Sequence, residues 1–106
     1  MALKELSIEG YKKQKDDDLQ ALFFTTPLCG TCDLAKKMLI LCLETLPSQA
    51  IPTYLCRVSE WQPFVQKWKI SSVPCLVFAA GDTLVERVAA FESVTKLYKA
   101  YTKYLD

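Results

Sequence analysis

The sequence predicts an α/β fold in which a central mixed β-sheet carries helices on both faces. Apolar runs of strand length alternate with segments of helical periodicity along most of the 106 residues. The run Leu22-Phe23-Phe24 has no polar break, which is typical of a strand covered on both faces. Two later strand-like runs are joined by Gly81-Asp82, a dipeptide typical of a turn between antiparallel neighbours. Together these features predict the element order β-α-β-α-β-α-β-β-α.

The N-terminal quarter is expected to form a strand, a helix and a second strand. Residues 3–8 have the composition of a short edge strand, and the polar helix that follows runs through Tyr11 and Lys15. Its acidic end at 16–18 is expected to lie in solvent. The apolar run at 19–25 predicts a buried strand.

The middle of the chain predicts two further helices around a strand. From Thr31 to about Leu46, apolar residues recur at the three- and four-residue spacing of a helix with a wide buried face: Leu34, Ala35, Met38, Leu39, Cys42, Leu43 and Leu46. The β-branched and aromatic content of 53–58 predicts a strand. Ser59 and Gln62 have the spacing of a capping box for a helix with one aromatic-rich face: Trp61, Phe64, Val65 and Trp68.

The C-terminal part predicts a β-hairpin and a closing helix. Pro74 opens a strand at 75–79, and 83–88 returns beside it as the antiparallel partner. The closing helix places five apolar or aromatic residues on one face: Val94, Leu97, Tyr98, Tyr101 and Leu105. The length fits a single domain over 1–106.

Composition and charge argue against several classes of function. Thirteen basic and twelve acidic residues leave a net charge of +1, so nucleic acid and anionic membranes are not expected partners. Lys4 and Glu5 stand where a signal peptide needs an apolar stretch, and no apolar run approaches the roughly 20 residues of a membrane span. We therefore expect a cytoplasmic monomer.

Two cysteines, Cys29 and Cys32, flank Gly30 and Thr31 at the predicted start of a helix. Free N–H groups and the helix dipole stabilise an anion there, so such a cysteine should ionise below the free-thiol pKa of about 8.5. The thiolate attacks disulfides, and a second thiol one turn later can displace the bound partner. The pair predicts a two-electron redox site whose spacer Thr31 leaves its N–H free to support the Cys29 thiolate.

A metal site is the competing interpretation of the cysteines. The chain has five cysteines and no histidine, whereas structural zinc sites normally use two close pairs, or one pair with histidines. Cys56 and Cys75 would have to complete such a site, so we expect no metal and no organic cofactor. Cys42 and Cys56 are expected to be buried core residues.

The strand before Cys29-Gly30-Thr31-Cys32, and the later Val73-Pro74 leading into a hairpin, resemble the thioredoxin family. The resemblance covers essentially the whole chain. It implies a thiol-disulfide oxidoreductase of cell redox homeostasis, acting on protein disulfides with electrons from a reductase or a small thiol. In that reaction Cys29 would be the attacking thiolate and Cys32 the resolving thiol.

The resemblance also implies a substrate groove. Pro74 would have a cis peptide bond and face the cysteine pair, presenting the Val73 backbone to an extended segment of the partner. Leu28 would lie on the same groove. Cys75 would then lie near the pair, either as a third thiol that can accept a disulfide or as a core residue.

The chain departs from thioredoxins at four positions. Leu28 stands in place of a tryptophan, Thr31 of a proline, Phe23 of a buried aspartate and Leu55 of a lysine. The aspartate is thought to relay the proton of the resolving thiol, so Cys32 would give its proton to water or to the partner. An alternative function therefore stays open: a binding or adaptor module of thioredoxin fold with little or no turnover.

Overall fold

A five-stranded mixed sheet lies at the centre of the computed structural model, which describes residues 3–14, 18–89, 91 and 93–105. Its strands, in the spatial order β1-β3-β2-β4-β5, are β1 (Lys4–Glu5), β2 (Gln20–Thr25), β3 (Thr53–Arg57), β4 (Cys75–Ala80) and β5 (Thr83–Val88). β1, β3 and β2 run parallel, whereas β4 is antiparallel to β2 and β5. The predicted hairpin at Gly81-Asp82 is confirmed.

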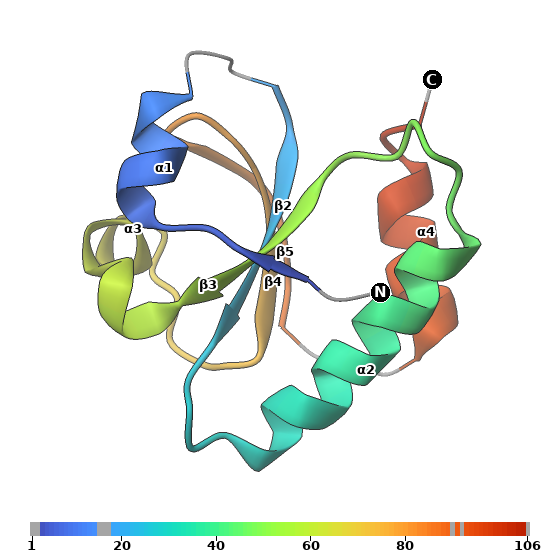
Figure 1. Ribbon diagram of the computed structural model, residues 1–106, viewed down its shortest axis with the longest axis horizontal. Coiled ribbons are helices and arrows are strands. Elements are labelled where there is room, and N and C mark those ends of the chain that lie inside the picture. Colours follow the sequence, from blue (N-terminus) through green and yellow to red (C-terminus); the bar gives the residue numbers. More distant parts are fainter. Residues whose placement is uncertain (1–2, 15–17, 90, 92, 106) are drawn as a thin grey trace.

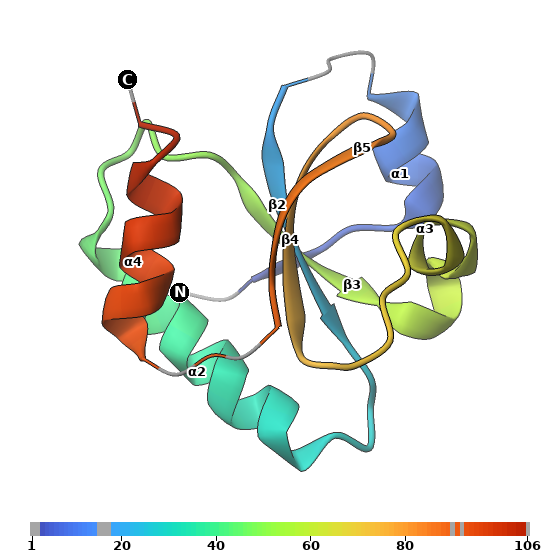
Figure 2. The same ribbon diagram turned by 180° about the vertical axis from the view of Figure 1, so that it is seen from behind.

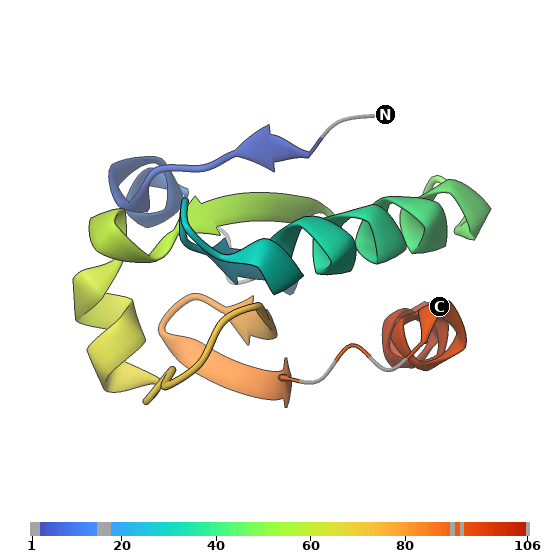
Figure 3. The same cartoon turned by 90° about the horizontal axis from the view of Figure 1, so that it is seen from below.

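Helices cover both faces of this sheet: α1 (Ile8–Lys13), α2 (Gly30–Thr45), α3 (Gln62–Lys67) and α4 (Val94–Thr102). Figures 1 and 2 show α1 and α3 on one face and α2 and α4 on the other. In Figure 3, α1 and α3 lie to the left of the strands and α2 and α4 to the right. In the part of the chain described here, no helix has the length and apolar character of a membrane span. The predicted α/β fold class is confirmed.

The central strand β2 and its neighbour β4 each contribute side chains to two separate core clusters. Leu22 and Phe24 of β2 pack with α1 and α3, around the buried Trp61. Phe23, between them in sequence, packs on the opposite face with α2 and α4, where Leu39 and Tyr101 are buried. Because successive strand residues face opposite sides, burial of both faces explains the unbroken apolar run of β2.

The N-terminal strand is shorter than predicted. Only Lys4–Glu5 pairs with β3, and Ser7 then caps α1 by accepting a 3.0 Å hydrogen bond from a backbone N–H of the first turn. Ile8 therefore begins a helix instead of ending a strand. Residues 15–17 lie outside the described residues, and Asp18 is exposed, as expected.

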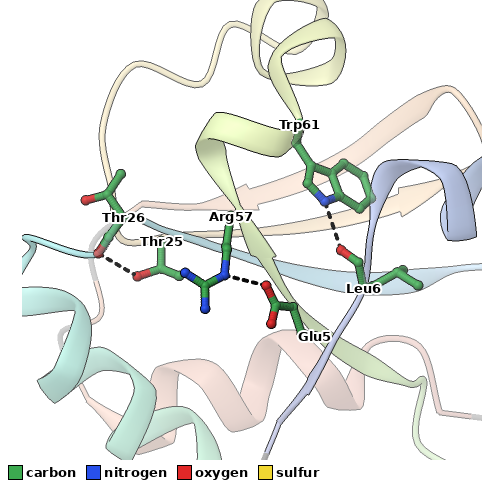
Figure 4. A network of polar contacts seen from close by, with 6 residues as sticks. All are labelled: Glu5, Leu6, Thr25, Thr26, Arg57 and Trp61. Atoms are coloured by element: carbon green, nitrogen blue, oxygen red, sulfur yellow. Dashed lines mark hydrogen bonds and ion pairs between the residues drawn. The ribbon is translucent and has the colours of Figure 1, made fainter.

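The capping box predicted for Ser59 and Gln62 is wrong. Val58–Glu60 form a 3₁₀ turn, and Trp61 precedes α3 without a side-chain cap. The Trp61 indole is fully buried and donates a 3.0 Å hydrogen bond to the carbonyl of Leu6 (Figure 4). Burial of this large side chain sets where α3 begins, and Gln62 donates back to the preceding turn. The aromatic face of α3 packs in the core, as predicted.

Two predicted buried faces are narrower than the sequence period suggests. Leu34 of α2 is 62% exposed and Tyr98 of α4 is 39% exposed, while Leu105 lies beyond the end of α4. The buried line of α2 consists of Cys32, Ala35, Leu39 and Cys42. Leu34 lies at the edge of this line, on the side of α2 that faces Pro74 across an open groove.

Candidate active site at the start of α2

The cysteine pair lies at the start of α2, just after β2 and its loop. Cys29 is the N-cap residue, and a disulfide joins it to Cys32 with the Cα atoms 5.2 Å apart. The Cys32 N–H donates to Cys29 Sγ at 3.1 Å, and the Thr31 hydroxyl lies 3.4 Å from the same sulfur. In the reduced protein these donors and the dipole of the 16-residue helix would stabilise a thiolate at Cys29.

The two sulfurs differ in access to solvent. Cys29 is half-buried, whereas Cys32 is only 3% exposed. A Cβ placed on Gly30 would have no atom within 4 Å, so the space beside the motif is open. A large partner can therefore approach Cys29 but not Cys32.

The other three cysteines are buried free thiols. Burial raises the pKa of Cys42 to about 11 and also raises the pKa values of Cys56 and Cys75. Cys75 packs in the cluster under α1 and α3, on the face of the sheet opposite to α2. Among the residues that the structure describes, no group of three or more acidic, cysteine or histidine side chains is arranged to hold a metal ion.

These differences predict the order of alkylation. In the reduced native protein at neutral pH, iodoacetamide should modify Cys29 first and leave Cys42, Cys56 and Cys75 unmodified until the protein unfolds. Raising the pH to about 9 should not bring in Cys42, because its pKa of about 11 keeps it protonated there. Peptide mass mapping measures the order. Faster modification of Cys42 or Cys56 than of Cys29 would show that the outer thiol is misassigned.

An apolar groove lies beside the cysteine motif. The Val73–Pro74 peptide bond is cis, as the family resemblance implied, and Pro74 opens β4. A cavity of about 240 Å³ separates Pro74 from α2 and is lined by Thr31, Leu34, Ala35, Met38, Ala89 and Phe91. Leu28, in the loop before Cys29, is fully exposed. Leu28 before the motif and Leu34 after it in the chain thus both present exposed apolar side chains.

Val73 packs against the cluster on the α1 and α3 face. Of the three residues predicted for the groove, Pro74 lines this cavity, whereas Val73 and Leu28 are not among its lining residues. Leu34, Met38 and Phe91 line it but were not predicted to. Thr31, Leu34 and Met38 follow one another at helical spacing, which is the pattern that predicted core packing. Their period alone does not separate a groove from a core, because both need an apolar helix face.

Apolar side chains occupy the two positions to which the family resemblance assigns a buried acid and a lysine. Phe23 and Leu55 are register partners in the parallel pair of β2 and β3. Phe23 is fully buried, with its ring centroid 5.8 Å from that of Phe91. The interior behind the cysteine motif therefore offers no carboxylate from β2 to accept a proton.

A separate cavity, of about 170 Å³, is lined in part by Cys32. Its lining includes Thr25, Cys32, Asp33, Lys36, Leu55 and Arg57. Arg57, at the end of β3, forms an ion pair with Glu5 of β1 (Figure 4). The charged residues of this cavity come from β3 and the first turns of α2, and their proximity was not predicted from the sequence.

Comparison with known proteins gives one relative in sequence and several in structure. The chain is 43% identical over 84 residues to the thioredoxin-like protein YusE of Bacillus subtilis (strain 168), covering 79% of this chain and 77% of that protein. The thioredoxin of Malassezia sympodialis superimposes with a TM-score of 0.80 at 20% identity, over 97% of this chain and 90% of that chain. A mutant thioredoxin from Halobacterium salinarum superimposes with a TM-score of 0.77 at 20% identity, over 99% of this chain and 91% of that chain. No family model matches the chain.

Proposed function

Because the chain belongs to the thioredoxin family, we propose that it is a thiol-disulfide oxidoreductase that exchanges a Cys29/Cys32 dithiol with disulfides of partner proteins. The observation that carries the proposal is the asymmetric pair at the helix start. The outer sulfur of Cys29 accepts an N–H bond at 3.1 Å, whereas Cys32 is buried beneath it. This arrangement supports an attacking role for Cys29 and a resolving role for Cys32.

The reaction needs only the two sulfurs of the site and the partner's disulfide. The Cys29 thiolate attacks one partner sulfur, forming a mixed disulfide and releasing the other partner sulfur as a thiolate. The Cys32 thiolate then attacks Cys29 Sγ, forming the internal disulfide, and the second partner sulfur leaves with the electron pair. Two electrons pass to the partner, and its two sulfurs take up protons. A reductase or a small thiol restores the dithiol, so no organic cofactor is required.

The groove supports an extended, apolar partner segment as the substrate. Pro74 faces α2 across the cavity that Leu34 and Met38 also line, and Leu28, next to Cys29 in the chain, adds a fully exposed apolar side chain. An extended segment lying along this surface would cover apolar area while placing its disulfide at the outer sulfur. The buried free thiols support a reducing compartment such as the cytoplasm.

Turnover distinguishes this proposal from an adaptor role. With dithiothreitol as electron donor, the wild-type protein should reduce insulin disulfides faster than dithiothreitol alone, and Cys29→Ser should return the rate to that background. Precipitation of the insulin B chain, followed by turbidity, measures the rate. Equal rates for the wild type and Cys29→Ser would overturn the oxidoreductase proposal and favour a binding module, which the missing buried acid would suit.

A further inference from the structure

The resolving cysteine lies against a polar cavity although it is almost inaccessible from the surface. Cys32 is 3% exposed, yet it forms part of the wall of the 170 Å³ cavity. That volume is several times the roughly 30 Å³ that one water molecule occupies in the liquid. The lining also offers polar groups that can hydrogen-bond to water. The cavity can therefore hold water in contact with the Cys32 side chain.

Cationic groups outnumber anionic groups on the cavity wall. α2 contributes Asp33 and Lys36, and β3 contributes Arg57. Thr25, from β2, is uncharged. Glu5, from β1, is the ion-pair partner of Arg57 (Figure 4), and the Glu60 carboxylate, in the 3₁₀ turn after β3, also interacts electrostatically with Arg57. Two cations and one carboxylate thus line the cavity, and two further carboxylates, Glu5 and Glu60, act on Arg57 without lining it.

We propose that Cys32 loses its proton to water in this cavity, and that Arg57 and Lys36 stabilise the thiolate that remains. The inference rests on the proposed function, in which Cys32 must ionise to attack Cys29 Sγ. The proton passes to water and then to the solvent, while the sulfur keeps the electron pair that forms the new S–S bond. Arg57 and Lys36 act here as positioning residues, because neither side chain takes part in bond formation.

Cys32 thus lies beside a cavity lined by two cations instead of beside a buried carboxylate. A carboxylate in the core would accept the proton directly, but Phe23 closes that position. A positive charge near a thiol lowers its pKa by Coulomb attraction to the thiolate. Arg57 and Glu5 are about half exposed, with 46% and 48% of their side chains accessible, so the attraction should weaken in high salt.

The test is a titration of the Cys32 thiol in reduced protein. The thiolate absorbance of Cys29→Ser, minus that of Cys29→Ser/Cys32→Ser, isolates Cys32 from the three buried thiols. Adding Arg57→Met to both should raise the pKa of Cys32 by about half a unit or more, as expected for one charge at several ångströms. Arg57→Lys keeps the positive charge and should leave the pKa of Cys32 near its value with Arg57. Glu5→Gln removes the ion-pair partner of Arg57 and should lower the pKa of Cys32 below that value.

Two other variants separate electrostatics from general damage. Lys36→Met removes the second cation from a different element and should shift the pKa of Cys32 in the same direction as Arg57→Met. Lys67→Met removes a cation from an exposed ion pair with Asp82, in the hairpin turn at the far end of β4 from Pro74, and should leave the pKa unchanged. Thermal unfolding confirms that each variant is folded.

An unchanged pKa in both Arg57→Met and Lys36→Met would overturn this inference, as would an equal shift in Lys67→Met. The titration needs no partner protein, so its failure is distinct from failure of the proposed function. If the wild type shows no turnover but the pKa shifts as expected, the proposed function fails and the electrostatic role of Arg57 and Lys36 stands.

Discussion

The Cys32→Ser variant should remain covalently attached to partner proteins through Cys29. In this variant Cys29 remains the N-cap of α2, and the backbone N–H of residue 32 can still donate to its sulfur. The attack of Cys29 on the partner disulfide should therefore proceed. A serine hydroxyl does not attack a disulfide, and the mixed disulfide then awaits an external thiol. Turnover should fall by roughly a hundredfold or more, since loss of one member of a catalytic pair removes most of its effect.

Non-reducing electrophoresis of reduced Cys32→Ser with a disulfide-bonded protein such as insulin shows the adduct directly, and its mass identifies the linkage. The matched control is Cys29→Ser, whose remaining motif thiol is only 3% exposed and should form little adduct. The double serine variant measures the background from the three buried thiols. Equal adducts from both single variants would contradict the assigned roles, and no adduct from either would favour an adaptor.

Local sequence patterns predicted the secondary structure correctly where a single local feature determines it. The unbroken apolar run of β2 predicted a strand buried on both faces because both core clusters draw on it. The hairpin followed from Gly81, whose positive φ of 58° suits a glycine. The start of α3 did not follow, because burial of Trp61 and its bond to Leu6 override the local capping pattern.

The site was predictable only in its local part. Cys29 and Cys32 are neighbours in sequence, so spacing alone indicated a disulfide at a helix start. The cavity behind Cys32 was not predictable in this way, because Arg57 reaches it through the pairing of β3 with β2. Glu5 joins the network through the pairing of β1 with β3. Such a network depends on strand order, which hydrophobic periodicity does not determine.

The apolar groove was also not predictable from hydrophobic periodicity, as one residue of α2 shows. Leu34 has the spacing of a core residue in α2 but is 62% exposed. Its side of the helix faces Pro74 and Phe91 across a cavity, not a neighbouring helix. Whether an apolar residue at the edge of a helix face is covered depends on which loop lies next to it. A partner segment bound in the proposed groove would cover Leu34.

Phe23→Asp should destabilise the protein by about 3–5 kcal/mol or more at neutral pH, the typical cost of truncating a buried phenylalanine. Phe23 is fully buried in the cluster under α2 and α4, and its register partner Leu55 offers no positive charge. The new carboxylate would be desolvated, so its pKa in the folded state should rise above the unfolded value of about 3.9. The substitution therefore combines a cavity with an unpaired buried charge.

The pH dependence separates these two contributions. Because the folded-state pKa is raised, the charge penalty is absent below the unfolded pKa of about 3.9 and grows as the pH rises through the folded-state value. Phe23→Leu leaves a smaller cavity without a charge, and its destabilisation should not vary with pH in this way. Urea unfolding of both variants between about pH 3 and pH 8, each compared with the wild type at the same pH, measures the difference.

A compensating charge on the neighbouring strand completes the test. Leu55 lies beside Phe23 in the sheet and lines the polar cavity at Cys32, so a lysine there can place its ammonium in that cavity. In Phe23→Asp/Leu55→Lys, the pair should recover about 1–3 kcal/mol relative to the sum of the single changes. Additive effects at neutral pH, or a Phe23→Asp penalty independent of pH, would contradict a buried carboxylate at this position, because both results require the introduced acid to reach solvent.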